Sequence, residues 1–108
     1  MKAVDDKRAA FQKDLTRLRG VIMDARASQR VRGDNELIDG LDSARNIVEE
    51  SRRAWGSGNT RLALELALDA FEEAEGLLHE AGAPTKAINL VQQSMDRWGK
   101  ELQSLEYE

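Results

Sequence analysis

The chain has 108 residues, a formal net charge of −4 and no cysteine. This length is typical of one domain with a single modest core, so we expect residues 1–108 to form one domain. The absence of cysteine excludes disulfides, thiolate zinc sites and cysteine nucleophiles. Apolar residues make up 41% of the chain and charged residues of both signs 33%, a composition that favours a folded chain over a disordered one.

The beginning of the chain is charged and contains no apolar stretch. Residues 1–8 read Met-Lys-Ala-Val-Asp-Asp-Lys-Arg, which predicts that there is no signal peptide. No window of the chain reaches the run of about 18 apolar residues that marks a membrane span. We therefore expect a cytoplasmic protein without a membrane partner.

Glycine and proline divide the chain into four segments. The breaks lie at Gly33, at Gly56–Gly58 and at Gly82. Each combines a glycine that stops a helix with a residue that starts the next one, namely Asp34, Asn59 or, at a first-turn position, Pro84. These breaks predict helices over residues 5–32, 35–55, 60–81 and 85–106.

Each segment repeats apolar residues in steps of three and four, the pattern of packed helices, and none alternates with the period of a strand. The predicted core positions are Val4, Phe11, Leu15, Leu18, Ile22, Ala25, Leu37, Leu41, Ala44, Val48, Ser51, Trp55, Leu64, Ala67, Phe71, Ala74, Leu78, Ala81, Ile88, Val91, Met95, Trp98, Leu102 and Leu105. Because short loops make consecutive helices antiparallel, the pattern predicts an all-α fold: an antiparallel four-helix bundle or two stacked helical hairpins.

Gly20 lies in the middle of the first segment, on the side away from the predicted core. A glycine inside a helix costs about 1 kcal/mol relative to alanine. We therefore expect the first helix to bend or break near this residue.

The sequence contains little that points to catalysis. The one histidine, His79, follows Glu75 by four residues, so the two can share a helix face. A zinc site needs at least three protein ligands, and no further ligand joins this pair. We interpret His79 as a surface residue. We predict no catalytic, cofactor-binding or metal-binding residues and no enzyme activity.

Charge is distributed unevenly along the chain. Residues 7–32 carry eight basic and two acidic side chains, whereas residues 61–80 carry one basic and six acidic side chains. Arg19, Arg26 and Arg30 share one face of the first helix, and Glu65, Asp69 and Glu72 mark an acidic face of the third. These six residues are the predicted partner-binding positions.

Trp55 is a seventh candidate. Its spacing predicts a core position near one end of the bundle, but it borders a glycine loop, so an exposed binding hot spot is the alternative.

Several functions fit this charge pattern. The main hypothesis is a non-catalytic protein–protein interaction module, either an adaptor or a small helical subunit, that binds another protein or itself. The alternatives are a nucleic-acid-associated protein that uses the basic face of the first helix, and an acidic inhibitor of a nucleic-acid-binding protein. The net charge of −4 disfavours nucleic-acid binding. The uneven distribution of charge is also consistent with a basic and an acidic helix that are simply solvated and face each other across the bundle.

Overall fold

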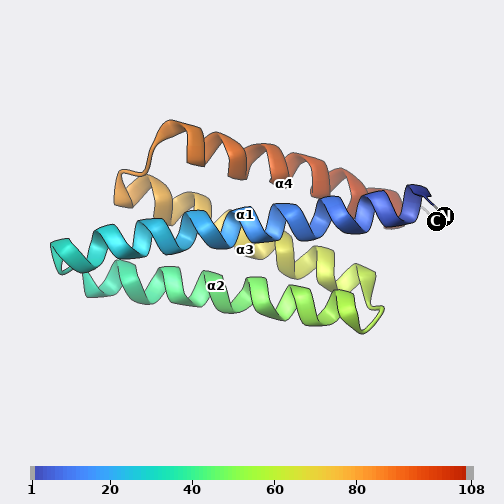
Figure 1. Cartoon of the computed structure of the whole chain (residues 1–108), viewed down its shortest axis with the longest axis horizontal. Coiled ribbons are helices and arrows are strands. Elements are labelled where there is room, and N and C mark those ends of the chain that lie inside the picture. The colour runs from blue at the N-terminus through green and yellow to red at the C-terminus, as the bar shows by residue number, and fades with distance from the viewer. Residues whose placement is uncertain (1, 107–108) are drawn as a thin grey trace.

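Four long helices account for nearly the whole chain (Figure 1). The computed structural model describes the backbone of residues 2–106 and the side chains of residues 6–105. The helices are α1 (Lys2–Arg32), α2 (Asn35–Gly56), α3 (Thr60–Ala81) and α4 (Thr85–Glu106). No strand occurs among the described residues, so the prediction of an all-α, antiparallel bundle is confirmed. The predicted helix limits differ mainly at α1, which begins three residues earlier than expected.

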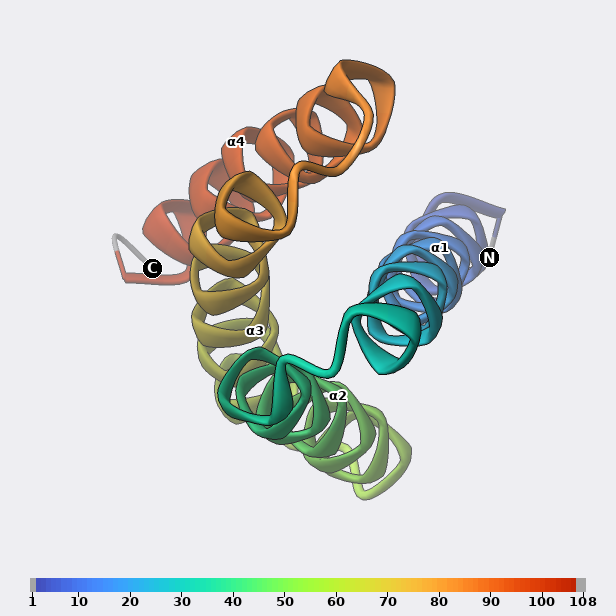
Figure 2. The same ribbon diagram turned by 90° about the vertical axis from the view of Figure 1, so that its left-hand side faces the viewer.

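The helices follow one another around the bundle, so that each packs on its neighbour in sequence (Figure 2). The α1–α4 side is the least closed, because these two helices contact each other over the fewest residues.

At 1.5 Å per residue, the 31 residues of α1 span about 46 Å. This equals the 46 Å long axis of the molecule, and α1 runs its full length. No helix in the described part of the chain has a stretch long and apolar enough to cross a membrane.

Local capping fixes where the helices begin and end. The Asp34 carboxylate accepts a hydrogen bond from the Leu37 amide at 3.1 Å, and the Asn59 side chain accepts one from the Leu62 amide at 3.2 Å. These bonds satisfy amides that have no partner within the first turn. Each of the three loops also contains a glycine with positive φ, a conformation that other residues rarely adopt: Gly33, Gly58 and Gly82.

Pro84 differs slightly from its predicted position. It precedes the first helical residue, Thr85, instead of lying inside the first turn. Its carbonyl accepts the Ala87 amide at 3.0 Å, so it supplies the first acceptor of α4. Its missing N–H costs nothing there, because amides at a helix start have no intrahelical partner.

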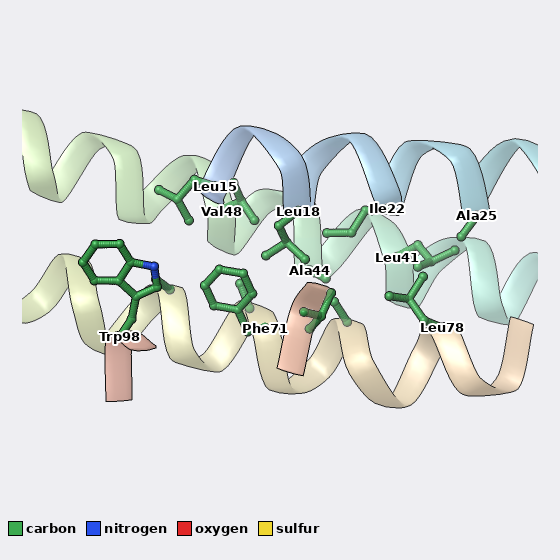
Figure 3. Close-up of a cluster of buried hydrophobic side chains, with 14 of the residues drawn as sticks. Leu15, Leu18, Ile22, Ala25, Leu41, Ala44, Val48, Phe71, Leu78 and Trp98 are labelled. Carbon is green, nitrogen blue, oxygen red and sulfur yellow. The ribbon is translucent and has the colours of Figure 1, made fainter. Parts of the chain in front are cut away.

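The core contains the side chains that the periodicity predicts. In Figure 3, Leu15, Leu18 and Ile22 of α1 point towards residues of α2 and α3 such as Val48 and Phe71. Every predicted core residue whose side chain is described is buried or packed partly buried against this cluster. The remaining one, Val4, lies outside the residues whose side chains are described.

A buried carboxylate joins α1 to α4. Asp14 is only 7% exposed, and its Oδ2 atom accepts a hydrogen bond from the Trp98 indole N–H at 2.8 Å. Arg97 lies at the edge of this pair, with Nη1 3.8 Å from the same oxygen. The Trp98 ring also meets Phe11 edge-on at 5.0 Å between centroids. This contact therefore combines apolar burial with a directional polar bond at the side of the bundle where the helices otherwise touch least.

Two other buried polar side chains bind backbone carbonyls. The Ser51 hydroxyl donates to the Ala63 carbonyl at 2.6 Å, which links α2 to α3. The Gln29 amide donates to the Ala81 carbonyl at 3.4 Å, near the C-terminal end of α3. Both side chains can lie in the core because their polar groups are hydrogen-bonded.

The expected break at Gly20 does not occur, because α1 is continuous from Lys2 to Arg32. Gly20 is exposed, and no atom lies within 4 Å of the position that a β-carbon would occupy. The helix tolerates this glycine at an energetic cost, without a break. Gly40 on α2 is different, because a β-carbon there would lie 2.8 Å from Cδ2 of Leu77 on α3.

Replacing Trp98 with phenylalanine should lower the free energy of unfolding by about 1–3 kcal/mol, because Asp14 then stays buried without its main donor. Asp14→Asn keeps an acceptor of the same shape for the indole and should cost less than Trp98→Phe. Urea unfolding followed by circular dichroism measures both changes. Equal stability of Trp98→Phe and the unmodified protein would show that the bond contributes nothing.

Gly20→Ala should raise the free energy of unfolding by about 0.5–1 kcal/mol, because alanine favours the helix and meets no neighbouring atom. The same urea titration measures this gain. Asp24→Ala, an exposed change on the same helix that removes no glycine, serves as a comparison. A loss of stability in Gly20→Ala would mean that the glycine is needed for the shape of α1.

Candidate interaction surface

Two of the three predicted arginines on α1 bind carboxylates of α2. The Arg26 Nε atom lies 2.7 Å from Asp42 Oδ1, and both side chains are about one-quarter to one-third exposed. The Arg19 Nε atom lies 3.5 Å from Glu49 Oε1. The basic helix is therefore partly neutralised by α2, and no ion pair joins α1 to the acidic helix α3 among the described side chains.

Arginines of α2 enlarge the same surface. The Arg52 Nη1 atom lies 3.9 Å from Glu49 Oε1, and its Nη2 atom donates a hydrogen bond to the Thr16 hydroxyl of α1 at 2.6 Å. Arg45 approaches the sulfur of Met23 at 3.8 Å. Arg30 is exposed and has no ion pair among the described residues.

We call this side of the α1–α2 pair the basic surface. It consists of the arginines and carboxylates along the line where the two helices meet: Arg19, Arg26, Arg30, Arg45, Arg52, Asp42 and Glu49. Five guanidinium groups face two carboxylates there, so the surface keeps a net positive charge after the internal pairs have formed. Met23 lies among these arginines and is 37% exposed.

The acidic residues of α3 lie on its outward side. Glu65, Asp69, Glu72, Glu73 and Glu80 are all exposed, and we call them the acidic face. Glu65 pairs with Arg61 at 3.3 Å, within the same helix. In the part of the chain whose side chains are described, the other four make no ion pair. Like charges three or four residues apart destabilise a helix by a few tenths of a kcal/mol per pair, so this face repels itself.

A shallow hollow of about 400 Å³ lies beside this acidic face, between α2 and α3. Its lining consists of small or apolar groups and a rim of polar side chains: Gly40, Ser43, Glu72, Glu73, Gly76, Leu77 and Glu80. Gly76 leaves open space where a side chain would stand, since nothing lies within 4 Å of its β-carbon position. The hollow therefore combines an apolar floor with carboxylates from the acidic face.

Trp55 has mainly a packing role. It is half-buried, and its ring stacks on Phe11 at 4.5 Å between centroids with an interplanar angle of 25°. Its exposed part lines a cavity of about 200 Å³ together with Lys7, Trp98 and Glu101. The predicted core position is thus correct, and the side chain is only partly accessible.

The described residues contain no arrangement suited to metal binding. His79 is exposed, and no three histidine or carboxylate side chains of the described residues cluster as metal ligands would. No third metal ligand joins Glu75 and His79 among the described residues. The absence of catalytic activity stays a prediction from the sequence.

Some of these residues were not foreseen from the sequence. Asp14 lies three residues after Phe11 and four before Leu18, so the core periodicity did carry a signal for its burial. Arg45 and Arg52 carried no such signal, because nothing in α2 alone shows that they join the arginines of α1.

The chain matches no protein-family model, no curated protein sequence and no solved structure.

Arg26→Glu should lower the free energy of unfolding by about 1 kcal/mol, because it removes a partly buried ion pair and sets a carboxylate against Asp42. Arg30→Glu makes the same charge change at an exposed position in the last turn of α1, with no ion pair among the described residues. Only the helix dipole opposes this change, so it should cost less than Arg26→Glu. Urea unfolding at low ionic strength compares the two. Equal losses in both variants would contradict the role assigned to the Arg26–Asp42 pair.

Proposed function

We propose that this protein is a non-catalytic interaction module that binds a basic protein surface through the acidic face of α3. The observation that supports this proposal is the contrast between α1 and α3. Carboxylates of α2 already bind Arg19 and Arg26, whereas Asp69, Glu72, Glu73 and Glu80 have no cation beside them among the described side chains. Oppositely charged surfaces steer encounter and select partners, so an unmatched acidic face favours a basic partner.

The shape of the surface supports a protein as the partner. The hollow beside the acidic face has Gly40, Gly76 and Leu77 in its lining, so it can take an apolar side chain or the aliphatic stem of a lysine or arginine. Its rim of Glu72, Glu73 and Glu80 would then face the cationic end of such a side chain. An adaptor or a small subunit of a larger assembly would use this kind of surface. An acidic inhibitor that occupies the nucleic-acid groove of another protein would use the same residues.

The basic surface supports a second candidate, contact with nucleic acid. Arg45 and Arg52 of α2 add to the arginines of α1, and arginine binds phosphate as well as carboxylate. Asp42 and Glu49 lie among these arginines and would repel phosphates. We therefore rank this candidate second.

The Asp69→Lys/Glu72→Lys variant should lose the partner, with affinity falling more than about tenfold, because like charges then face each other across the interface. The measurement is affinity capture from a lysate of the native host, with and without nuclease, read by quantitative mass spectrometry. Asp39→Lys/Asp96→Lys is the matched control, because it changes the net charge equally at exposed residues of α2 and α4.

Retention of the partner by the control and its loss from the α3 variant would support the proposal. A partner that both variants retain would rule out the acidic face as its binding site. A set of partners that disappears when nuclease is added would favour the nucleic-acid candidate.

A further inference from the structure

The basic surface and the acidic face belong to different sides of the molecule. The basic surface follows the line between α1 and α2, whereas the acidic face and its hollow lie on α3 and along the line between α2 and α3. Figure 2 shows α1 and α3 on opposite sides of the bundle. The two surfaces share no residue, so one copy of the chain can present both to other molecules at the same time.

Their charges are complementary after the internal ion pairs are counted. The basic surface has three more guanidinium groups than carboxylates, in its set of Arg19, Arg26, Arg30, Arg45, Arg52, Asp42 and Glu49. The acidic face has four carboxylates without an ion pair among the described residues: Asp69, Glu72, Glu73 and Glu80. Each surface therefore carries the counter-charge that the other lacks.

Their shapes are complementary as well. Met23 stands among the arginines of the basic surface with 37% of its area exposed, and the Arg45 guanidinium lies beside its sulfur. Methionine is flexible and fills irregular hollows. The hollow by the acidic face has an apolar floor at Gly76 and Leu77 and an acidic rim. A methionine surrounded by arginines fits a hollow surrounded by carboxylates.

From these observations we infer that the chain binds a second copy of itself head to tail, with the basic surface of one copy on the acidic face of the next and Met23 in the hollow. This inference rests on the proposed function and names its partner. Because two different surfaces meet, the contact is heterologous, so the copies form a ring or an open chain and not a closed symmetric dimer.

A second copy accounts for more of the surface than other partners do. A separate basic protein would occupy the acidic face and leave Met23 and the unpaired arginines uncovered. A nucleic acid would bring phosphates next to Asp42 and Glu49 and would leave the acidic face unused. Self-association pairs both surfaces at once. Since the attraction is mainly between exposed charges, it should weaken as salt is added.

The test is sedimentation velocity of the full chain at low and high ionic strength, over a range of concentrations. The unmodified protein should sediment as species larger than a monomer at low ionic strength and return towards the monomer at high ionic strength. Two variants remove one surface each: Arg30→Glu/Arg45→Glu reverses the net charge of the basic surface, and Asp69→Lys/Glu72→Lys neutralises the acidic face. Neither pair includes a residue that forms an ion pair among the described residues, so both variants should fold.

Each variant alone should be monomeric, because the altered surface no longer has a net charge opposite to that of the intact one. The basic surface changes from three excess positive charges to one excess negative charge, and the four unpaired positions of the acidic face become neutral overall. An equimolar mixture of the two should form a complex, because the intact basic surface of one variant meets the intact acidic face of the other. Regained association in the mixture cannot arise from unfolded variants. Lys86→Glu/Lys100→Glu and Asp39→Lys/Asp96→Lys are the matched controls; they alter exposed residues elsewhere and should associate as the unmodified protein does.

A further variant tests the hollow without changing any charge. Gly76→Leu places a side chain in open space, so it should fold and gain helix stability. It should nevertheless abolish self-association by filling the site of Met23. Association of Gly76→Leu at the unmodified level would overturn the assignment of Met23 to the hollow.

Other outcomes would overturn the inference as a whole. A monomer at low ionic strength rules out self-association, and the proposed function then stands or falls on the separate capture experiment with Asp69→Lys/Glu72→Lys. A monomer that binds a labelled DNA duplex, and loses it in Arg30→Glu/Arg45→Glu, assigns the basic surface to nucleic acid. Association that persists in both charge-reversed variants places the contact elsewhere on the molecule.

Discussion

The hydrogen bond between Asp14 and Trp98 closes the one side of the bundle that short loops cannot hold together. Consecutive helices are neighbours because loops of a few residues join them, whereas α1 and α4 must meet across 84 residues of chain. Burying a carboxylate is costly unless a hydrogen-bond donor reaches it, so the Asp14 side chain can be buried in only a few orientations of α1. With Phe11 packed against the same indole, this bond fixes how α1 is rotated about its own axis.

The rotation of α1 determines which charges are matched inside the molecule. With Phe11 and Asp14 turned inward, Arg19 and Arg26 lie on the side of α2 and meet Glu49 and Asp42. Surface ion pairs of this kind, exposed as at Arg19 or partly buried as at Arg26, contribute only about 0–1 kcal/mol each, so they matter little for stability. Their larger effect is on the charges that remain at the surface. They reduce the positive charge of α1, while Asp69, Glu72, Glu73 and Glu80 of the acidic face keep no ion pair among the described side chains.

The sequence was sufficient for the parts of the fold that depend on local chemistry. Positive-φ glycines and the caps at Asp34 and Asn59 act within a few residues, and the core periodicity acts within one helix. The charged surfaces depend on which helix lies beside which and at what rotation. Arg45 therefore looked like an ordinary solvated residue of α2, although it lies beside Met23 of α1. The acidic face was predictable because α3 forms it without help from another helix.

Charge and shape have different roles at such a surface. Repulsion among the carboxylates of α3 is a cost that the isolated chain carries, and any cationic partner relieves it. Because a ligand that binds only the folded state stabilises that state, occupancy of this face is coupled to the stability of α3. Charge alone attracts many cations without fixing how they sit. The hollow at Gly76 and Leu77 adds an apolar contact of defined position. Such a contact fixes how a partner is aligned on the surface, and it disfavours partners that have no side chain to fill the hollow.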